Sequence, residues 1–275
     1  MSGKNLDFFI FISEMLPAMK NILFLFILLF SFRALGCICD PPSITENFAK
    51  SDFVARAKIV KNYKNEDLTE RYKADIEIQE LYKGVMIKSI FVYGRSDGRM
   101  GSSCALFIPE NTELIIYANK NTDGNYSVGY CSGLLYLKNK GSKKEKRDLG
   151  ILDAFKNSGL SFTNKISFSE SPISYKDATS LHEKLEKYKG IVLEKSYGIY
   201  QITFATDLKI LNVECLSGFG MHVDEELVEL LKTTKWTSFH KGIRDQVPDQ
   251  SKLLVGIYYY PKQNGKESYL TNYYF

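Results

Sequence analysis

The segment Cys37-Ile38-Cys39 contains the residue that could bind a metal ion through its backbone. The sequence before it predicts that Cys37 becomes the first residue of the mature protein. A new N-terminus carries a free α-amine with a pKa of about 8, so part of it is unprotonated at neutral pH. Such an amine, together with the carbonyl oxygen of the same residue, can chelate a zinc ion that keeps an open coordination position. The elements that follow must therefore hold this terminus in place.

The leader before these cysteines has the three parts of a secretory signal peptide. Lys20 precedes an unbroken apolar run over residues 22–30, and Ala34 and Gly36 are small residues at the two positions that a signal peptidase reads. The apolar run is too short to span a bilayer. We expect cleavage after Gly36, so that residues 1–36 form the signal peptide.

The segment before Met19 is interpreted as an upstream mis-start, because a second positive region begins there. The mature protein is expected to be exported, to the periplasm, the cell surface or the extracellular space. A lipid anchor at Cys37 is an alternative, although Ala34 stands where a lipidated cysteine normally has Leu three residues before it.

The composition bounds the class of protein. The 275 residues carry a net charge of +4, which argues against a nucleic-acid partner and against attachment to anionic membranes. The chain beyond the leader is long enough for two domains of about 100 residues each. All five cysteines lie beyond the leader, and export favours the pairing of at least four of them.

Residues 37–138 alternate apolar and polar side chains, as half-buried strands do. The pattern is clearest where Phe53, Ala55, Ala57 and Ile59 alternate with their neighbours. The expected strands are 53–59, 72–78, 90–93, 114–118 and 126–130, and an Asp-Gly pair at 123–124 favours a tight hairpin between the last two. Five short strands without a long helix between them predict a small closed barrel in a mainly β protein.

Five segments of this first domain carry a resemblance to a known family. They are Cys37-Ile38-Cys39-Asp40-Pro41-Pro42, Ser51-Asp52-Phe53-Val54-Ala55-Arg56-Ala57-Lys58, Tyr82-Lys83-Gly84, Ser103-Cys104 and Cys131-Ser132. In order and spacing they resemble the inhibitory domain of tissue inhibitors of metalloproteinases, a netrin-like OB-fold barrel. The resemblance covers residues 37–138.

The resemblance implies two disulfides, Cys37–Cys104 and Cys39–Cys131, while Ala49 stands where a third bridge would begin. It also implies that Cys37 chelates the catalytic zinc of a target protease and that Ile38 fills the specificity pocket of that protease. The residues that it assigns to protease binding are Ile38, Cys39, Asp40, Ser102 and Ser103.

Residues 139–186 are expected to connect two domains. The basic run Lys138–Arg147 is interpreted as a solvated linker rather than a polyanion-binding patch. Apolar residues at helical spacing predict a short helix that ends at Gly159, and another is expected over Ala178–Tyr188. The polar segment Ser161–Ser174 is predicted to be the domain linker and a site of limited proteolysis.

Residues 187–275 are predicted to form an α+β domain with β-β-α-β order. Strands are expected at 199–204, 210–216 and 253–260, and an apolar stripe predicts a helix around Leu227. The region 187–262 resembles the C-terminal domain of TonB, the energy transducer of bacterial outer-membrane transport. The resembling residues are Asp207, Ser217-Gly218, Asp224-Glu225, Trp236 and Gly242, and Ser238 replaces a frequent proline. A cell-envelope protein could bind this domain by adding a strand to its sheet, or the domain could be a spacer.

Nothing in the sequence predicts an enzyme, a cofactor or a metal site of the chain's own. His182, His222 and His240 are scattered and are expected to be surface or capping residues. Glycine-rich phosphate loops and nucleophile elbows are missing from the sequence. Cys215 is expected to be a buried, unpaired and inert thiol.

Two functions follow as hypotheses. The first is an exported metalloprotease-inhibitor-like protein from a bacterium with an outer membrane. The alternative is a non-inhibitory cell-envelope binding protein in which the barrel is only a scaffold.

Overall fold

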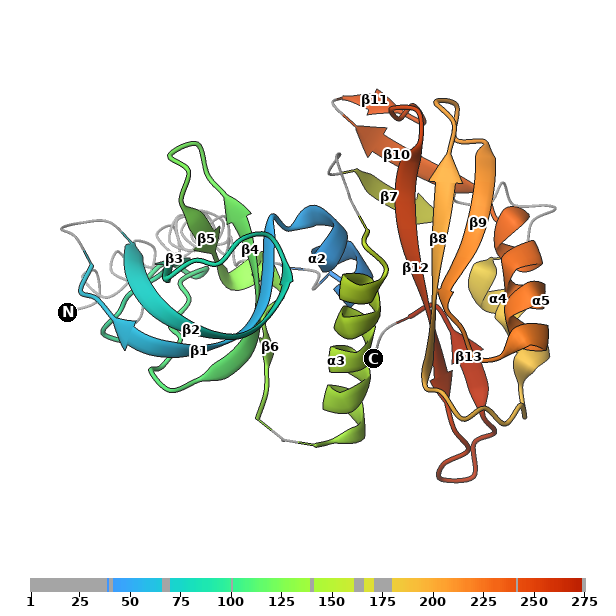
Figure 1. Cartoon of the computed structure of the whole chain (residues 1–275), viewed down its shortest axis with the longest axis horizontal. Coiled ribbons are helices and arrows are strands. Elements are labelled where there is room, and N and C mark those ends of the chain that lie inside the picture. The colour runs from blue at the N-terminus through green and yellow to red at the C-terminus, as the bar shows by residue number, and fades with distance from the viewer. Residues whose placement is uncertain are drawn as a thin grey trace, which may run out of the picture. The chain divides into compact units, whose positions relative to one another are not determined.

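Five strands of the N-terminal part close into a barrel, because the fourth strand in the sequence pairs back with the first (Figure 1). The strands are β1 (Phe53–Asn62), β2 (Arg71–Lys83), β3 (Ser89–Tyr93), β4 (Glu113–Lys120) and β5 (Tyr126–Val128), and the short β6 (Leu135–Tyr136) adds to β4. Around the sheet the order is β1-β2-β3-β5-β4-β6. The pairing of β3 with β5 is parallel and the others are antiparallel. The five strands and the closed barrel predicted from the sequence are confirmed.

The chain is described by a computed structural model, and Cys39–Phe275 forms one compact unit in it. The described residues are 39, 42–65, 70–99, 101–138, 141–160, 166–170, 180–240 and 242–273. The predicted signal peptide, the predicted mis-start, Cys37, Ile38 and Asp40 lie outside them.

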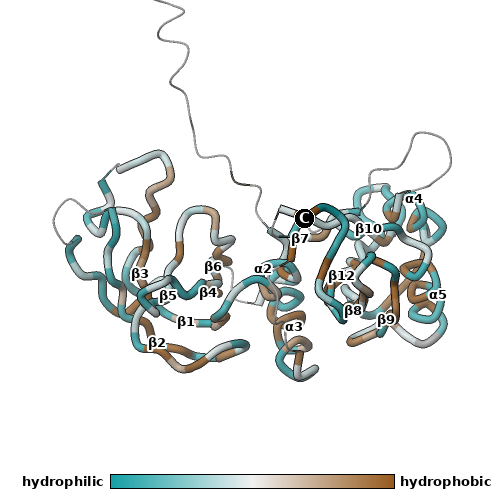
Figure 2. Tube along the Cα trace, turned by 90° about the horizontal axis from the view of Figure 1, so that it is seen from above, coloured by the Kyte–Doolittle hydropathy of each residue, from teal (hydrophilic) through white to brown (hydrophobic). Residues whose placement is uncertain are grey.

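The interior of the barrel follows the alternation seen in the sequence. Phe53, Ala55, Ala57 and Ile59 are all fully buried, in one cluster with apolar side chains of β2, β3 and β4. Figure 2 shows brown, hydrophobic stretches alternating with teal, hydrophilic ones along the barrel strands. Val54, which points to the other face of β1, is also fully buried, because helices cover this outer face.

Two helices pack on the barrel. Helix α2 (Ile44–Lys50) and helix α3 (Lys143–Asn157) meet where the rings of Phe48 and Phe155 lie 4.6 Å apart, centroid to centroid. Ser142 caps α3 by accepting a hydrogen bond from the Glu145 backbone N–H at 3.1 Å.

The interpretation of Lys138–Arg147 as a solvated linker is therefore wrong for residues 143–147, which form the first turns of α3. Arg147 is buried there, and its guanidinium stacks on the rings of Tyr258 and Tyr260. A Ser-x-x-Glu helix start, Ser142 to Glu145, was hidden within the basic run.

The C-terminal part is a second β-rich region with helices. Its larger sheet is antiparallel with the order β13-β12-β8-β9, from β8 (Tyr197–Phe204), β9 (Ile210–Ser217), β12 (Ser251–Tyr260) and β13 (Tyr269–Thr271). Helix α5 (Met221–Lys232) follows β9 and buries Leu227 and Leu231 in the core of this region. The short helix α4 (Leu181–Leu185) and the 3₁₀ turn η3 (Glu186–Tyr188) precede β8. The predicted β-β-α-β elements are present, while the TonB-like identity and the domain boundaries stay predictions.

Part of the segment predicted to be the polar linker forms a strand of a smaller sheet. Strand β7 (Ser167–Glu170) lies inside the segment predicted to be a polar linker and pairs with β10 (Trp236–His240), which pairs in turn with β11 (Ile243–Arg244). The ring of Phe168 stacks on that of Phe204 at 5.1 Å. One apolar residue among serines was too weak a signal to predict this strand.

A third cluster of buried side chains contains residues from both parts of the unit. It includes Val54 and Tyr117 of the barrel, Phe155 of α3, and Ile199 and Tyr258 of β8 and β12.

Among the residues described, no helix has both the length and the apolar character needed to cross a membrane.

Candidate functional site

One end of the barrel gathers the described residues that the sequence assigned to the site. Since β3 and β5 run parallel, with Val92 opposite Val128, the chain leaves both strands at the same end. The loop between β1 and β2 reaches this end too, because Arg71 at the start of β2 pairs with Tyr93 at the end of β3. Three connecting segments, those after β1, β3 and β5, therefore form this end of the barrel.

A disulfide ties the start of the described chain to this end. Cys39 is bonded to Cys131, with a Cα–Cα distance of 5.4 Å across a sequence separation of 92 residues. Cys131 lies in a 3₁₀ turn (Tyr130–Ser132) that follows β5 directly. This pairing is confirmed. Cys104 is disulfide-bonded as well, and its predicted partner Cys37 lies outside the described residues.

Tyr93 links the segment around Cys104 to the segment around Cys131. Its carbonyl oxygen accepts a hydrogen bond from the Leu106 backbone N–H at 2.8 Å. Its ring lies beside Gly129, where an added Cβ would be 3.6 Å from Cδ2 of the tyrosine. Leu106 lies two residues after Cys104, and Gly129 lies two residues before Cys131. Tyr93 therefore contacts both segments, each within two residues of a disulfide-bonded cysteine.

Ser102 and Ser103, both predicted to contact a protease, are exposed on the long loop between β3 and β4. The Ser102 backbone N–H donates to Oε1 of Glu70 at 2.8 Å, and its carbonyl oxygen accepts from the Ala105 N–H at 2.9 Å in a tight turn. Hydrogen bonds from Ser102 hold the pKa of Glu70 below its usual range. Glu70 thus positions this turn, a role that the sequence did not reveal.

The long loop is also fixed where it returns to the barrel. The buried hydroxyl of Tyr72 accepts a hydrogen bond from the Ile108 N–H at 2.9 Å. Burial raises the pKa of Tyr72 to about 12, so this phenol stays protonated across the physiological range. The segment that carries the exposed serines is therefore held at both ends.

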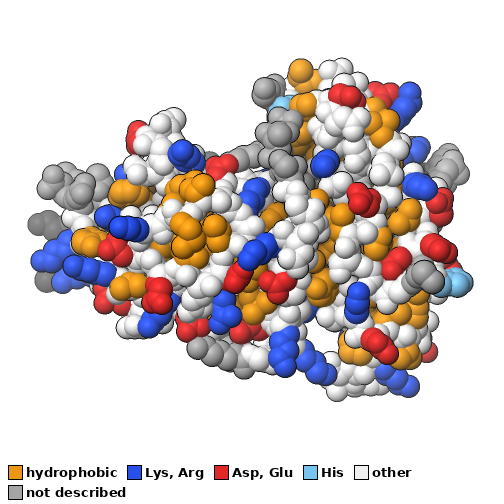
Figure 3. Space-filling view, in the orientation of Figure 1, with side chains coloured by type: hydrophobic (Ala, Val, Ile, Leu, Met, Phe, Trp, Pro, Cys, Tyr) orange, Lys and Arg blue, Asp and Glu red, His pale blue; other side chains and the backbone are white. Residues whose placement is uncertain are grey.

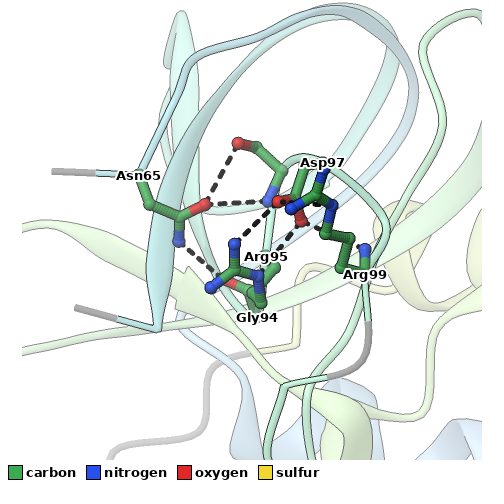
Figure 4. Close-up of polar contacts among 6 residues, drawn as sticks. Asn65, Gly94, Arg95, Asp97 and Arg99 are labelled. Atoms are coloured by element: carbon green, nitrogen blue, oxygen red, sulfur yellow. Dashed lines mark hydrogen bonds and ion pairs between the residues drawn. The ribbon is translucent and has the colours of Figure 1, made fainter. Parts of the chain in front are cut away.

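The first part of the same loop is clamped by Asn65, which comes from the loop after β1 (Figure 4). Its side-chain amide donates to the Gly94 carbonyl oxygen at 2.8 Å, and its oxygen accepts from the Ser96 N–H at 2.9 Å. One amide side chain thereby joins two loops of the barrel end.

Asp97 organises the tip of this loop (Figure 4). Its carboxylate accepts two hydrogen bonds from the Arg95 guanidinium, at 3.1 and 2.7 Å, and a third from the Arg99 backbone N–H at 3.0 Å. These bonds, led by those from Arg95, lower the pKa of Asp97 to about 2. The turn signal Asp97-Gly98 between two arginines was visible in the sequence but was not interpreted as part of the site.

Gly94 permits the close approach of the two halves of the loop. Its φ is +155°, and an added Cβ would lie 2.0 Å from the carbonyl oxygen of Leu106. A side chain at this position would separate the segment after β3 from the segment that carries Cys104.

The N-terminal part of the chain, which contains the barrel, matches a known protein family. Residues 35–148 match the family model of the tissue inhibitor of metalloproteinase. The match includes all six strands of the barrel sheet and reaches into α3. The matched residues contain the closed five-stranded barrel, and the family that the model describes is one of inhibitors. A comparison with curated proteins finds no match to the chain.

The described histidines and cysteines show no preformed metal site. Within the part of the chain that the structure describes, no three His, Cys, Asp or Glu side chains are grouped so as to hold a metal ion. His222 is exposed and lies 3.2 Å from Glu226, and the ring of His182 lies beside that of Tyr273.

The expectation that Cys215 is buried is wrong. Cys215 is unpaired, as predicted, but it is exposed on β9, an edge strand of the larger sheet. The prediction depended on the apolar neighbours of Cys215 in the sequence, but β9 is the outermost strand of its sheet and leaves this side chain exposed at the edge. Partial desolvation of the thiol and the nearby Asp224 raise its pKa to about 11.

Proposed function

We propose that this chain is an exported metalloprotease-inhibitor-like protein whose mature N-terminal residue, Cys37, chelates the catalytic zinc of a target protease. The observation that carries the proposal is the Cys39–Cys131 disulfide at the end of a barrel that matches the tissue inhibitor of metalloproteinase model. This bond fixes the residue two positions after the proposed ligand to the same barrel end as the exposed Ser102 and Ser103.

The proposed chemistry uses the α-amine and the carbonyl oxygen of Cys37. An α-amine has a pKa of about 8, well below that of lysine, so the unprotonated form is available at neutral pH. The chelate would displace the water that occupies the open position of a catalytic zinc, and the protease would lose its nucleophile. The zinc in this scheme belongs to the protease.

The neighbouring residues would bind the protease around its metal. Ile38 is apolar and would enter a hydrophobic specificity pocket, while Asp40 would stay solvated at the rim. Ser102 and Ser103 would contact the same protease from the loop after β3. Rigid attachment of these segments lowers the ordering cost of association, and the Cys39 disulfide and the Glu70 contact supply that rigidity.

The test is an inhibition assay with a panel of zinc metalloproteases. The mature chain beginning at Cys37 is compared with an N-acetylated copy and with a copy extended by one alanine before Cys37. Inhibition by the unmodified chain alone supports the chelate, because blocking the amine removes the ligand. Equal potency of all three would refute the chelate, and inhibition by none of them would favour the alternative in which the barrel is a scaffold for cell-envelope binding.

Export and the state of the new N-terminus belong to the same proposal. Mass analysis of the native protein should show a chain that begins at Cys37 with an unmodified amine. An acylated Cys37 would instead support a lipid anchor and would exclude zinc chelation by that amine.

A further inference from the structure

Arg99 presents its guanidinium outward from the loop that carries Ser102 and Ser103. Its side chain is 82% exposed, and its Nε lies 3.8 Å from Oδ2 of Asp97, which is longer than a hydrogen bond. The fork of Arg95 is used differently, because it makes two hydrogen bonds to the same carboxylate. Of the two arginines at this tip, Arg99 is therefore the one whose guanidinium N–H donors face solvent.

The backbone that carries Arg99 is fixed before any partner arrives. Its own N–H donates to Asp97 at 3.0 Å, and Asn65 holds the preceding segment through Gly94 and Ser96. Binding residues are found disproportionately on surface loops that a rigid scaffold positions. The side chain of Arg99 therefore starts from a defined place on the surface.

Arg99 is close enough to the proposed contact residues to share their partner. Ser102 lies three positions further along the chain, and an extended chain spans at most about 3.6 Å per position, so the two Cα atoms lie within about 11 Å. A standard interface covers about 800 Å² on each partner, a patch roughly 30 Å across, which is wider than this separation. A protease that covered Ser102 would therefore bring its own surface over Arg99.

The charge at this end of the barrel favours an acidic partner surface. Figure 3 shows a group of Lys and Arg side chains at the left of the view, with Asp and Glu side chains beside it. A guanidinium binds a carboxylate through two parallel hydrogen bonds, which gives geometric selectivity as well as attraction.

We propose that Arg99 is a specificity-determining residue that selects zinc metalloproteases with a carboxylate beside the active-site cleft. The inference rests on the proposed inhibitory function and names a feature of its target. Arg99 would act at the rim of the interface, so its effect would appear mainly as a salt-dependent change in affinity and association rate.

The experiment measures inhibition constants and association rates of the mature chain with catalytic domains of zinc metalloproteases. The domains are chosen as two groups, with acidic or with basic residues around the cleft. Three variants are compared with the parent chain, namely Arg99→Gln, Arg99→Glu and the matched control Arg244→Glu. Arg244 is a suitable control because its side chain is 71% exposed and its Nε lies 3.6 Å from a neighbouring carboxylate, that of Asp245.

For acidic-rim proteases we expect Arg99→Gln to weaken inhibition several-fold and Arg99→Glu at least tenfold at low ionic strength. Most of the difference should disappear in about 0.5 M salt, where screening is strong. Arg244→Glu should leave the inhibition constant unchanged, and thermal unfolding should show all variants folded.

Three outcomes separate this inference from the proposed function. Selective weakening by the two Arg99 variants supports it. Inhibition by the parent chain with equal constants for Arg99→Glu and Arg244→Glu overturns the role of Arg99 and leaves the inhibitory function intact. Failure of the parent chain to inhibit any member of the panel overturns both.

Discussion

Removing the Cys39–Cys131 disulfide should cost the chain a large part of its stability. The change is the double substitution Cys39→Ala with Cys131→Ala in the mature chain. The bond joins residues 92 positions apart, and the chain-entropy relation gives about 4.6 kcal/mol for a loop of this length. Because domains are typically stable by about 5–15 kcal/mol, this loss would bring the chain close to its unfolding threshold at 25 °C.

The assay is urea unfolding of the oxidised mature chain, followed by tryptophan fluorescence and circular dichroism. With a slope of about 2 kcal/mol per molar urea, the expected loss moves the midpoint down by about 2 M. Cys215→Ala is the matched control, because this thiol is unpaired and exposed, and it should change stability by less than about 0.5 kcal/mol. A midpoint shift for the double variant no larger than that of Cys215→Ala would refute the reasoning, since the bond would then constrain nothing.

Two further predictions concern the loop after β3. Gly94→Ala should destabilise the chain by about 1–3 kcal/mol in thermal unfolding, because the new Cβ meets the Leu106 carbonyl oxygen at a φ of +155°. Gly124→Ala is the control, because its φ of +82° is also positive but its Cβ would meet Cε of the flexible Lys120 at an ordinary 3.6 Å. This variant should cost less, and equal losses would contradict the crowding at Gly94. The contacts of Asp97 should persist from neutral pH down to about pH 4 and be lost as the pH falls through its lowered pKa of about 2. The amide shift of Arg99 in NMR should follow this titration, and a midpoint near the ordinary value of 3.8 would show that the Asp97 contacts do not form.

Period-two alternation was enough to predict the barrel strands and their buried faces. Phe53 and Ile59 lie inside as the pattern required, because a strand with one face in a core has little choice of register. Apolar neighbours in the sequence did not predict the exposure of Cys215, which lies on β9, the outermost strand of the larger sheet. Short strands such as β7 carry too few residues for a period to be visible.

The contacts that position the site were beyond prediction from one sequence. Asn65 donates a hydrogen bond to Gly94, and Glu70 accepts one from Ser102. The residues of each pair are about 30 positions apart in the sequence, and the pairing of β2 with β3 brings them together. No sequence pattern distinguishes an asparagine or glutamate that bridges two loops by hydrogen bonds from one that is solvated. The Cys39–Cys131 pairing was predictable because a family resemblance, rather than spacing, identified it.

The buried cluster that includes Val54, Phe155 and Tyr258 joins the barrel, α3 and the larger sheet through shared apolar contacts. Its side chains come from the barrel, from α3 and from the larger sheet, so the melting of any one of the three exposes apolar surface on the other two. We therefore expect one cooperative unfolding transition for the mature chain, with a calorimetric enthalpy equal to the van't Hoff enthalpy. A substitution in the C-terminal sheet would then lower the population of folded barrel, although it lies far along the chain from the residues proposed to bind a protease.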